Sequence, residues 1–170
     1  MESTSDLIFK FTLTIKNQLF IDYTSKDLSS YFELDIKKNT NDGLALLQQI
    51  ICREDFAPLI ISAKLAVTNL EENWKYQFRT IENQKETNWF SIHSTIKKIG
   101  DEYHFYGNTK NITAFKNQEE KARFSEERYQ FALDASSEGI WDLDVEKNLV
   151  YFSSQSMKMI GFEEKDTIIS

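Results

Sequence analysis

The sequence predicts an α+β fold in which helices pack on one face of a five-stranded antiparallel sheet and a long connecting helix follows. Three observations predict this class. Apolar and polar residues alternate in two early runs and in three later ones, and apolar residues recur at helical spacing between these groups. A segment rich in Glu, Lys, Arg, Gln and Ala comes after the last run. The order of elements is therefore two strands, helices, three strands and a helix.

Residues 8–23 predict a β-hairpin. In its first strand Phe9, Phe11 and Leu13 alternate with polar residues, which is the pattern of a half-buried strand. A polar triplet then breaks the alternation, and β character resumes after it. The two strands are therefore expected to pair through a short turn.

Helices are expected in the segment that follows the hairpin. Ser25 or Ser30 is expected to cap short helical turns. Residues 44–51 and 59–70 carry apolar residues at helical spacing, and Pro58 is well placed near the start of the second of these segments. They form either two helices or one kinked helix.

Three more strands complete the predicted sheet. Trp74, Tyr76 and Phe78 alternate with charged and polar residues, and the alternation returns over residues 90–96 after a polar turn. A third run covers residues 103–106. These strands are expected to pair in an antiparallel manner.

A continuous helix is predicted over residues 114–135, because helix-favouring residues dominate and opposite charges sit one turn apart. Phe115, Ala122 and Tyr129 recur every seven residues, with Phe124 beside them. This amphipathic stripe permits a two-stranded coiled coil without requiring one. These four residues are the candidates for a dimer contact through the linker helix.

The last 40 residues repeat the pattern of the first 40. WDLDVEKNLVYFSSQSMKMIGFEEK can be laid over FTLTIKNQLFIDYTSKDLSSYFELD, and each has a strand, a turn containing Lys-Asn, a second strand and a short helix. We therefore expect a domain over residues 1–113, a linker helix over 114–135 and the first part of a second, similar domain over 136–170. Because about 40 residues bury too little surface to fold alone, we expect a piece of a longer protein.

The composition argues against several classes of partner. A formal net charge of −7 disfavours nucleic acid, because binding would start against a repulsive field. Cys52 is the only cysteine, so no disulfide framework forms within one chain, and a reducing compartment, the cytoplasm, is expected. No segment is apolar over the length needed to cross a bilayer, and no cleavable signal is expected at the start of the chain.

No catalytic or metal site is expected in this segment. Acidic pairs such as Glu54 with Asp55 have no His at ligand spacing, so we expect them to be solvated. The sequence contains no Gly-rich phosphate loop, no Gly-x-Ser-x-Gly elbow and no His-Glu-x-x-His helix. The segment is therefore not expected to be an enzyme.

Four stretches resemble PAS sensory domains with their C-terminal (PAC) motif. ICREDF stands where such domains often have a His-Pro-Asp-Asp type of turn before a helix. WKYQFR, followed by TNWFSIHSTI, is similar to the paired strands in which an Arg and a Trp recur. YGNTKNITAFK is similar to the final strand, which ends in Gly before Asp-Ile-Thr and a basic residue. RYQFALDASSEGIWDLDVEKNLVYFSSQSMKMIGF is similar to the opening of a second PAS domain.

The first copy departs from this pattern at several positions. Asn111 replaces the usual Asp, Cys52 and Arg53 replace His-Pro, and Phe32 stands where the second copy has Gly161. These departures bear on the ligand more than on the fold.

The resemblance implies a sensory and signal-relay module of a bacterial signal-transduction protein. An output enzyme of the histidine kinase or diguanylate cyclase type would follow it in the chain. Asn111, Ile112 and Thr113 would form the joint between the last strand and the relay helix. Thr113 is expected to be the N-cap, whose hydroxyl satisfies an unpaired backbone N–H of that helix. The alternative is that Thr113 merely caps a linker helix.

The resemblance also argues against haem and flavin. Haem-binding members present a histidine from the long helix, whereas His93 and His104 lie on predicted strands and are expected to be exposed or satisfied in the core. Flavin-photosensing members need an Asn-Cys-Arg-Phe type of helix. Cys52 precedes Arg53 but lacks the neighbouring Asn and Leu-Gln, so a buried structural thiol is expected. No cofactor is predicted.

An apolar stripe is expected to line the cavity side of the sheet. Such bulky side chains leave little room compared with the roughly 300 Å³ of a usual ligand pocket, so we expect a filled or small cavity that an unknown small ligand could occupy. Trp74 and Trp89 either face outward as an interaction patch or pack in the core. The pocket-lining candidates are Phe9, Phe11, Leu13, Phe78, Phe90, Ile92 and Phe105.

Two functions from different classes stay open. In the first, a small ligand binds the module and shifts the register of the helix over residues 114–135. In the second, the module is a ligand-free element for protein–protein interaction and dimerisation. A homodimer, formed through the linker helix or the N-terminal region, is expected, without membrane contact in this segment.

Overall fold

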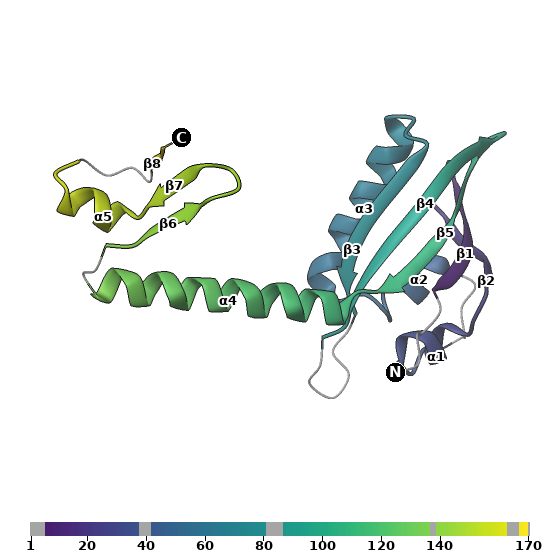
Figure 1. Cartoon of the computed structure of the whole chain (residues 1–170). Coiled ribbons are helices and arrows are strands. Elements are labelled where there is room, and N and C mark those ends of the chain that lie inside the picture. Colours follow the sequence, from purple (N-terminus) through teal and green to yellow (C-terminus); the bar gives the residue numbers. More distant parts are fainter. Residues whose placement is uncertain (1–5, 38–41, 81–86, 137–138, 163–166, 170) are drawn as a thin grey trace. The chain divides into compact units, whose positions relative to one another are not determined.

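The structure is a computed structural model that describes residues 6–37, 42–80, 87–136, 139–162 and 167–169. Two compact units make up the chain, Met1–Lys116 and Asn117–Ser170 (Figure 1).

The first unit is built on a five-stranded antiparallel sheet in the order β2-β1-β5-β4-β3 (Figure 1). β1 lies between β2 and β5, so the N-terminal hairpin and the later three-stranded meander join at the centre of the sheet. The last strand of the domain is therefore a central strand. The strands are β1 (Leu7–Thr14), β2 (Leu19–Thr24), β3 (Asn73–Arg79), β4 (Trp89–Ile99) and β5 (Glu102–Asn111).

Three helices cover one face of this sheet, namely α1 (Leu28–Phe32), α2 (Gly43–Leu47) and α3 (Arg53–Thr68). A continuous helix, α4 (Thr113–Ser136), follows β5 almost immediately. The predicted α+β fold, with helices on one face of a five-stranded antiparallel sheet and a long connecting helix, is confirmed. None of the described helices is long and apolar enough to cross a membrane.

Alternation along the strands decides which side chains face the helices. Every second residue of a strand points to the same face, and most inward positions of β1, β3 and β4 are buried. Buried side chains of α3 pack against them, and each fully buried aliphatic or aromatic side chain stabilises the fold by about 1.5–3 kcal/mol. The inward residues that are at most 9% exposed include Leu7, Phe9, Leu13, Trp74, Phe78, Phe90, Ile92 and Ile96 from the sheet, with Leu59 and Ala66 from α3.

A carboxylate caps α1, where a serine was expected. Asp27 Oδ2 accepts the backbone N–H of Ser30 at 3.1 Å. The prediction of Ser25 or Ser30 as the cap was wrong: Ser30 lies inside α1, and Ser25 Oγ accepts the backbone N–H of Ile8 instead. A charged acceptor makes the stronger hydrogen bond.

The second unit contains a short sheet in the order β6-β7-β8 and one helix after the hairpin. Its elements are β6 (Trp141–Asp144), β7 (Leu149–Phe152), α5 (Ser154–Met159) and β8 (Thr167–Ile169). Strand, turn, strand and short helix follow one another as in the first unit. That it begins a second PAS domain, with boundaries at residues 113 and 135, stays a prediction.

The two hairpins share a backbone feature. The Asn of each Lys-Asn turn has a positive φ, 60° at Asn17 and 53° at Asn148, a conformation that Asn adopts more readily than most residues. After α5 the left-handed position is Gly161. After α1 it is Glu33, which follows Phe32, a residue that is buried in the core with an exposure of 5%.

Candidate functional site

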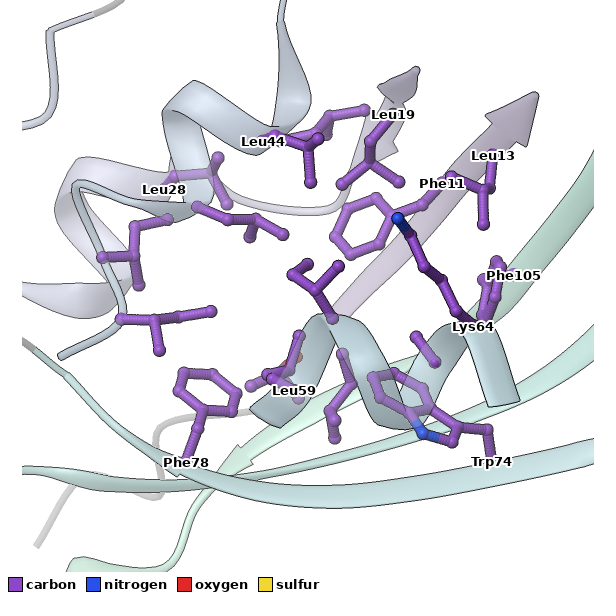
Figure 2. A pocket seen from close by; sticks show the side chains of 18 of the residues that line it. Phe11, Leu13, Leu19, Leu28, Leu44, Leu59, Lys64, Trp74, Phe78 and Phe105 are labelled. Carbon is purple, nitrogen blue, oxygen red and sulfur yellow. The ribbon is translucent and has the colours of Figure 1, made fainter. Parts of the chain in front are cut away.

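A small apolar cavity lies between the sheet and its three helices (Figure 2). Its volume is about 70 Å³, well below the roughly 300 Å³ of a usual ligand pocket. The expectation of a small cavity agrees with this volume, since bulky side chains from all five strands surround it.

Five of the seven predicted lining residues border the cavity, and they are Phe11, Leu13, Phe78, Ile92 and Phe105. The other two, Phe9 and Phe90, do not. Phe9 stacks on Phe11 with ring centres 4.3 Å apart, and Phe90 stacks on Phe78 at 5.9 Å. Both are at most 2% exposed, so they fill the core behind lining residues. That any of the seven contacts a ligand stays a prediction.

The helices supply lining residues that the sequence analysis missed. α1 contributes Leu28 and Phe32, α2 contributes Leu44, and α3 contributes Leu59 and Lys64. The helical spacing of apolar residues in these segments marked an inward face. It could not show which members of that face would meet the cavity, because that depends on how each helix sits on the sheet.

Trp74 and Trp89, for which the sequence allowed either an outward or a core position, lie on opposite faces of the sheet. Trp74 is 6% exposed and lines the cavity, and its Nε1 donates to Ser62 Oγ on α3 at 3.0 Å. Trp89 is half-buried on the other face, at the start of β4. Core packing therefore describes Trp74, whereas Trp89 belongs to a second cluster of contacts.

The triplet Asn111–Ile112–Thr113 is fastened to the first residue of β4. The Ile112 backbone N–H donates to the Trp89 carbonyl at 2.8 Å, and the Trp89 backbone N–H donates to Thr113 Oγ1 at 2.9 Å. The end of β5 and the beginning of α4 thus share one anchor on β4. That this triplet relays a signal stays a prediction.

The expected role of Thr113 as the helix cap is wrong. Its hydroxyl is engaged with Trp89, and Thr113 is already the first residue of α4. The Ile112 carbonyl accepts the first bond of the helix, from the Lys116 N–H at 2.9 Å, while Asn111 Oδ1 accepts the Thr113 N–H at 2.9 Å. An amide oxygen accepts this bond as a carboxylate would. The change from the usual Asp to Asn111 therefore keeps the acceptor.

Arg79, at the end of β3, connects α3 to the same anchor. Its Nε and Nη2 donate to the two carboxylate oxygens of Asp55 at 2.9 and 2.6 Å, and its backbone N–H donates to Asp55 Oδ2 at 2.8 Å. The guanidinium carbon lies 5.6 Å from the centre of the Trp89 ring, and Lys116 Nζ lies 5.5 Å from it. Asp55, Arg79, Trp89, Thr113 and Lys116 form what we name the relay cluster.

An ion pair between Asp55 and Arg79 contributes to the relay cluster. Hydrogen bonds from Arg79 lower the pKa of the Asp55 carboxyl below its ordinary value, and the hydrogen bond to Asp55 raises the pKa of Arg79. Both groups therefore stay charged over the ordinary pH range of a folded protein. A bidentate pair of this kind fixes orientation as well as distance.

Cys52 precedes the first turn of α3 and is half-buried, not buried as expected. Its backbone N–H donates to the Arg79 carbonyl at 2.9 Å. Burial raises the pKa of the Cys52 thiol, so the thiol is protonated near neutral pH. These are properties of a structural cysteine.

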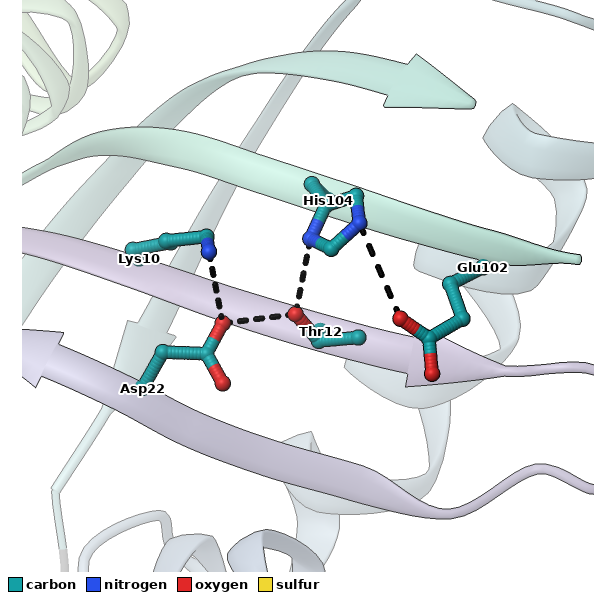
Figure 3. A network of polar contacts seen from close by, with 5 residues as sticks. All are labelled: Lys10, Thr12, Asp22, Glu102 and His104. Atoms are coloured by element: carbon teal, nitrogen blue, oxygen red, sulfur yellow. Dashed lines mark hydrogen bonds and ion pairs between the residues drawn. The ribbon is translucent and has the colours of Figure 1, made fainter. Parts of the chain in front are cut away.

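A polar network surrounds His104 on the face of the sheet opposite the helices (Figure 3). Thr12 Oγ1 lies 2.6 Å from Asp22 Oδ2 and 2.8 Å from His104 Nδ1, and Glu102 Oε2 lies 3.8 Å from His104 Nε2. Since the carboxylate of Asp22 only accepts, Thr12 donates to it, and Nδ1 of His104 donates to Thr12. His104, 8% exposed, is thus a satisfied strand histidine, whereas His93 is exposed, as expected.

The described residues contain no group of three or more His, Cys, Asp or Glu placed to hold a metal ion. The linker candidates lie on the surface of α4. Phe115 is 62% exposed, Phe124 60% and Tyr129 52%, and Ala122 is exposed too. That they form a dimer contact stays a prediction.

No protein-family model matches this sequence, and neither does any curated protein. Among solved structures, the chain is similar to the crystal structure of a PAS domain from a two-component sensor histidine kinase. The TM-score is 0.38 at 14% sequence identity, and the match covers 61% of this chain and 84% of that chain. The strand order and the placement of the helices define the fold class.

The ion pair predicts a pH-dependent stability. The pKa of Asp55 is lower in the folded protein than in the unfolded chain. The charged carboxylate therefore contributes fully to the free energy of unfolding above the unfolded pKa of about 3.9, and this contribution is lost as the pH falls through the folded-state pKa. We expect Asp55→Asn to lower the free energy of unfolding at pH 7 by about 1–2 kcal/mol, since the pair is partly exposed. Urea unfolding should show this difference shrinking as the pH falls below about 4.

Glu54→Gln is the matched control, since it removes an exposed charge from the same helical turn. It should cost much less stability than Asp55→Asn at pH 7. A loss in Asp55→Asn that is equal at pH 7 and at pH 3 would contradict the ion pair.

Proposed function

We propose that the chain is a non-enzymatic sensory and signal-relay module in which the state of the cavity is passed to the start of α4. The relay cluster is the observation that carries this proposal. α3 borders the cavity with Leu59 and Lys64 and holds Asp55 in its first turn. Asp55 binds Arg79, and Arg79 packs on Trp89, which anchors α4.

The small size of the cavity supports a role for α3 as the moving part. A ligand larger than about 70 Å³ has to displace part of the wall, and α3, a single helix of 16 residues that borders the cavity, would be the part displaced. A ligand shifts such an equilibrium only by its difference in affinity for the two arrangements. A wall that opens for the ligand supplies this difference, and the Asp55–Arg79 pair couples the displacement to Trp89.

The wider assignment is supported by the resemblance of the sequence to PAS domains. We propose a bacterial signal-transduction protein with an output enzyme of the histidine kinase or diguanylate cyclase type. α4 would carry the change toward that output, and a homodimer would bring two copies of α4 together. The cytoplasm is the proposed location.

The three tryptophans of the chain allow this proposal to be tested at both ends of the path. In a Trp74→Phe/Trp141→Phe variant only Trp89 emits, and in a Trp89→Phe/Trp141→Phe variant only Trp74 emits. During a titration with 1-hexanol, used as an apolar probe, we expect the emission of Trp74 to change because it lines the cavity. The emission of Trp89 should change over the same concentration range.

A Trp74→Phe/Trp89→Phe variant is the control, because its remaining Trp141 lies in the second unit. Its emission should not respond. If Trp74 responds to the probe and Trp89 does not, the cavity is not coupled to the anchor of α4, and the relay is refuted.

The second candidate function is a ligand-free interaction and dimerisation module. The exposed apolar side chains of α4 favour it, since Phe115, Phe124 and Tyr129 are each more than half exposed. Large apolar side chains gathered on one helix are a common signature of a protein–protein contact. Dimerisation is also compatible with ligand sensing. The two candidate functions therefore differ in whether a ligand binds in the cavity.

We expect the chain to sediment as a dimer in analytical ultracentrifugation at micromolar concentration. Ala122→Glu places a charge at the centre of the apolar stripe and should shift the chain to the monomer, because two buried like charges repel. Gln130→Glu adds the same charge at an exposed position outside the stripe and should leave the dimer intact. A monomer in the wild type would remove dimerisation through α4.

A further inference from the structure

The edge of the cavity carries a cation. Among the described residues that line the cavity, Lys64 alone has a charged side chain. Figure 2 shows this side chain extending from α3 toward Phe11 and Leu13, so that its nitrogen lies on the β1 side of the cavity. Lys64 itself is exposed, which keeps the ammonium in contact with water.

The Lys64 ammonium has no carboxylate partner in the part of the chain that the structure describes. The rest of the lining is almost wholly apolar. Leu59 and Phe78, 4% and 3% exposed, close the cavity on the side away from Lys64 (Figure 2). The cavity therefore combines an apolar chamber with one unpaired cation at its edge.

We propose that this cavity binds a short-chain aliphatic monocarboxylate, with the alkyl chain in the chamber and the carboxylate on Lys64. The inference rests on the proposed sensory function and names the ligand class of that same site. A volume of about 70 Å³ holds on the order of five water-sized groups, at about 10–15 Å³ each. An alkyl chain of about five carbons fills it, and the carboxylate makes the whole ligand larger than the resting cavity, so that it displaces part of the wall. Hexanoate is therefore a suitable probe.

The placement of Lys64 favours an anion over other head groups. An ionised head group does not enter an apolar chamber unpaired, because its desolvation is too costly. At the edge it stays partly hydrated and gains charge-assisted hydrogen bonds from the ammonium. A neutral hydroxyl gains only an ordinary hydrogen bond there, and a cationic head group is repelled.

Isothermal titration calorimetry on the whole chain at pH 7 and low salt tests this inference. Wild-type protein should bind hexanoate about tenfold more tightly than 1-hexanol, which has the same chain length and no charge. Lys64→Gln should weaken hexanoate binding about fivefold or more and leave 1-hexanol binding unchanged. Acetate should bind far more weakly than hexanoate because it leaves the chamber empty.

Lys97→Gln is the matched control, since Lys97 is an exposed lysine of β4 on the opposite face of the sheet. It should change neither affinity. If 1-hexanol binds and Lys64→Gln has no effect on hexanoate, the ligand class is wrong and the sensory function stands. If neither compound binds the wild type and the emission of Trp74 does not change, the ligand class and the ligand-sensing function fail together.

Discussion

The ion pair between Asp55 and Arg79 is the interaction on which the organisation of the first unit depends. It joins the first turn of α3 to the end of β3 through two side-chain hydrogen bonds and one backbone hydrogen bond. A guanidinium can bind a carboxylate in its plane and still present a flat face to an aromatic ring, which an ammonium cannot do. Arg79 uses both properties, because Trp89 lies beside it.

The register of the sheet places Arg79 beside Trp89. Arg79 and Trp89 are directly opposite each other on β3 and β4, so their side chains emerge on the same face. The same Trp89 receives the end of β5 and the beginning of α4 through backbone groups. The end of β3 and the junction of β5 with α4 therefore meet at one residue. The cavity lies on the other face of the same strands, and α3 belongs to both sites.

The strands and helices could be predicted because their signals are local. Alternation along β1 and β4 and helical spacing in α3 follow from the geometry of a single element. β5 was predicted only as far as residue 106 but continues to Asn111. Gly107 and Asn108 favour strands weakly, and the strand persists because β1 and β4 pair with it on both sides.

The relay cluster could not be predicted because its contacts are not local. Asp55 and Arg79 were both visible in stretches that resemble PAS domains, but no pattern in the sequence paired them. Thr113 was assigned to the helix that it begins, whereas its partner is Trp89, 24 residues earlier. Phe9 and Phe90 were placed on the correct face, but their distance from the cavity depends on where the helices pack.

Hydrogen exchange at the Lys116 amide, measured by NMR, tests the coupling between α3 and α4 most directly. This amide donates to the Ile112 carbonyl in the first turn of α4. If Arg79 links the cavity to α4, filling the cavity with 1-hexanol will change the exchange rate in the wild type and leave it unchanged in Arg79→Gln. The same change in both proteins, or no change in a wild type whose cavity is filled, would contradict the coupling.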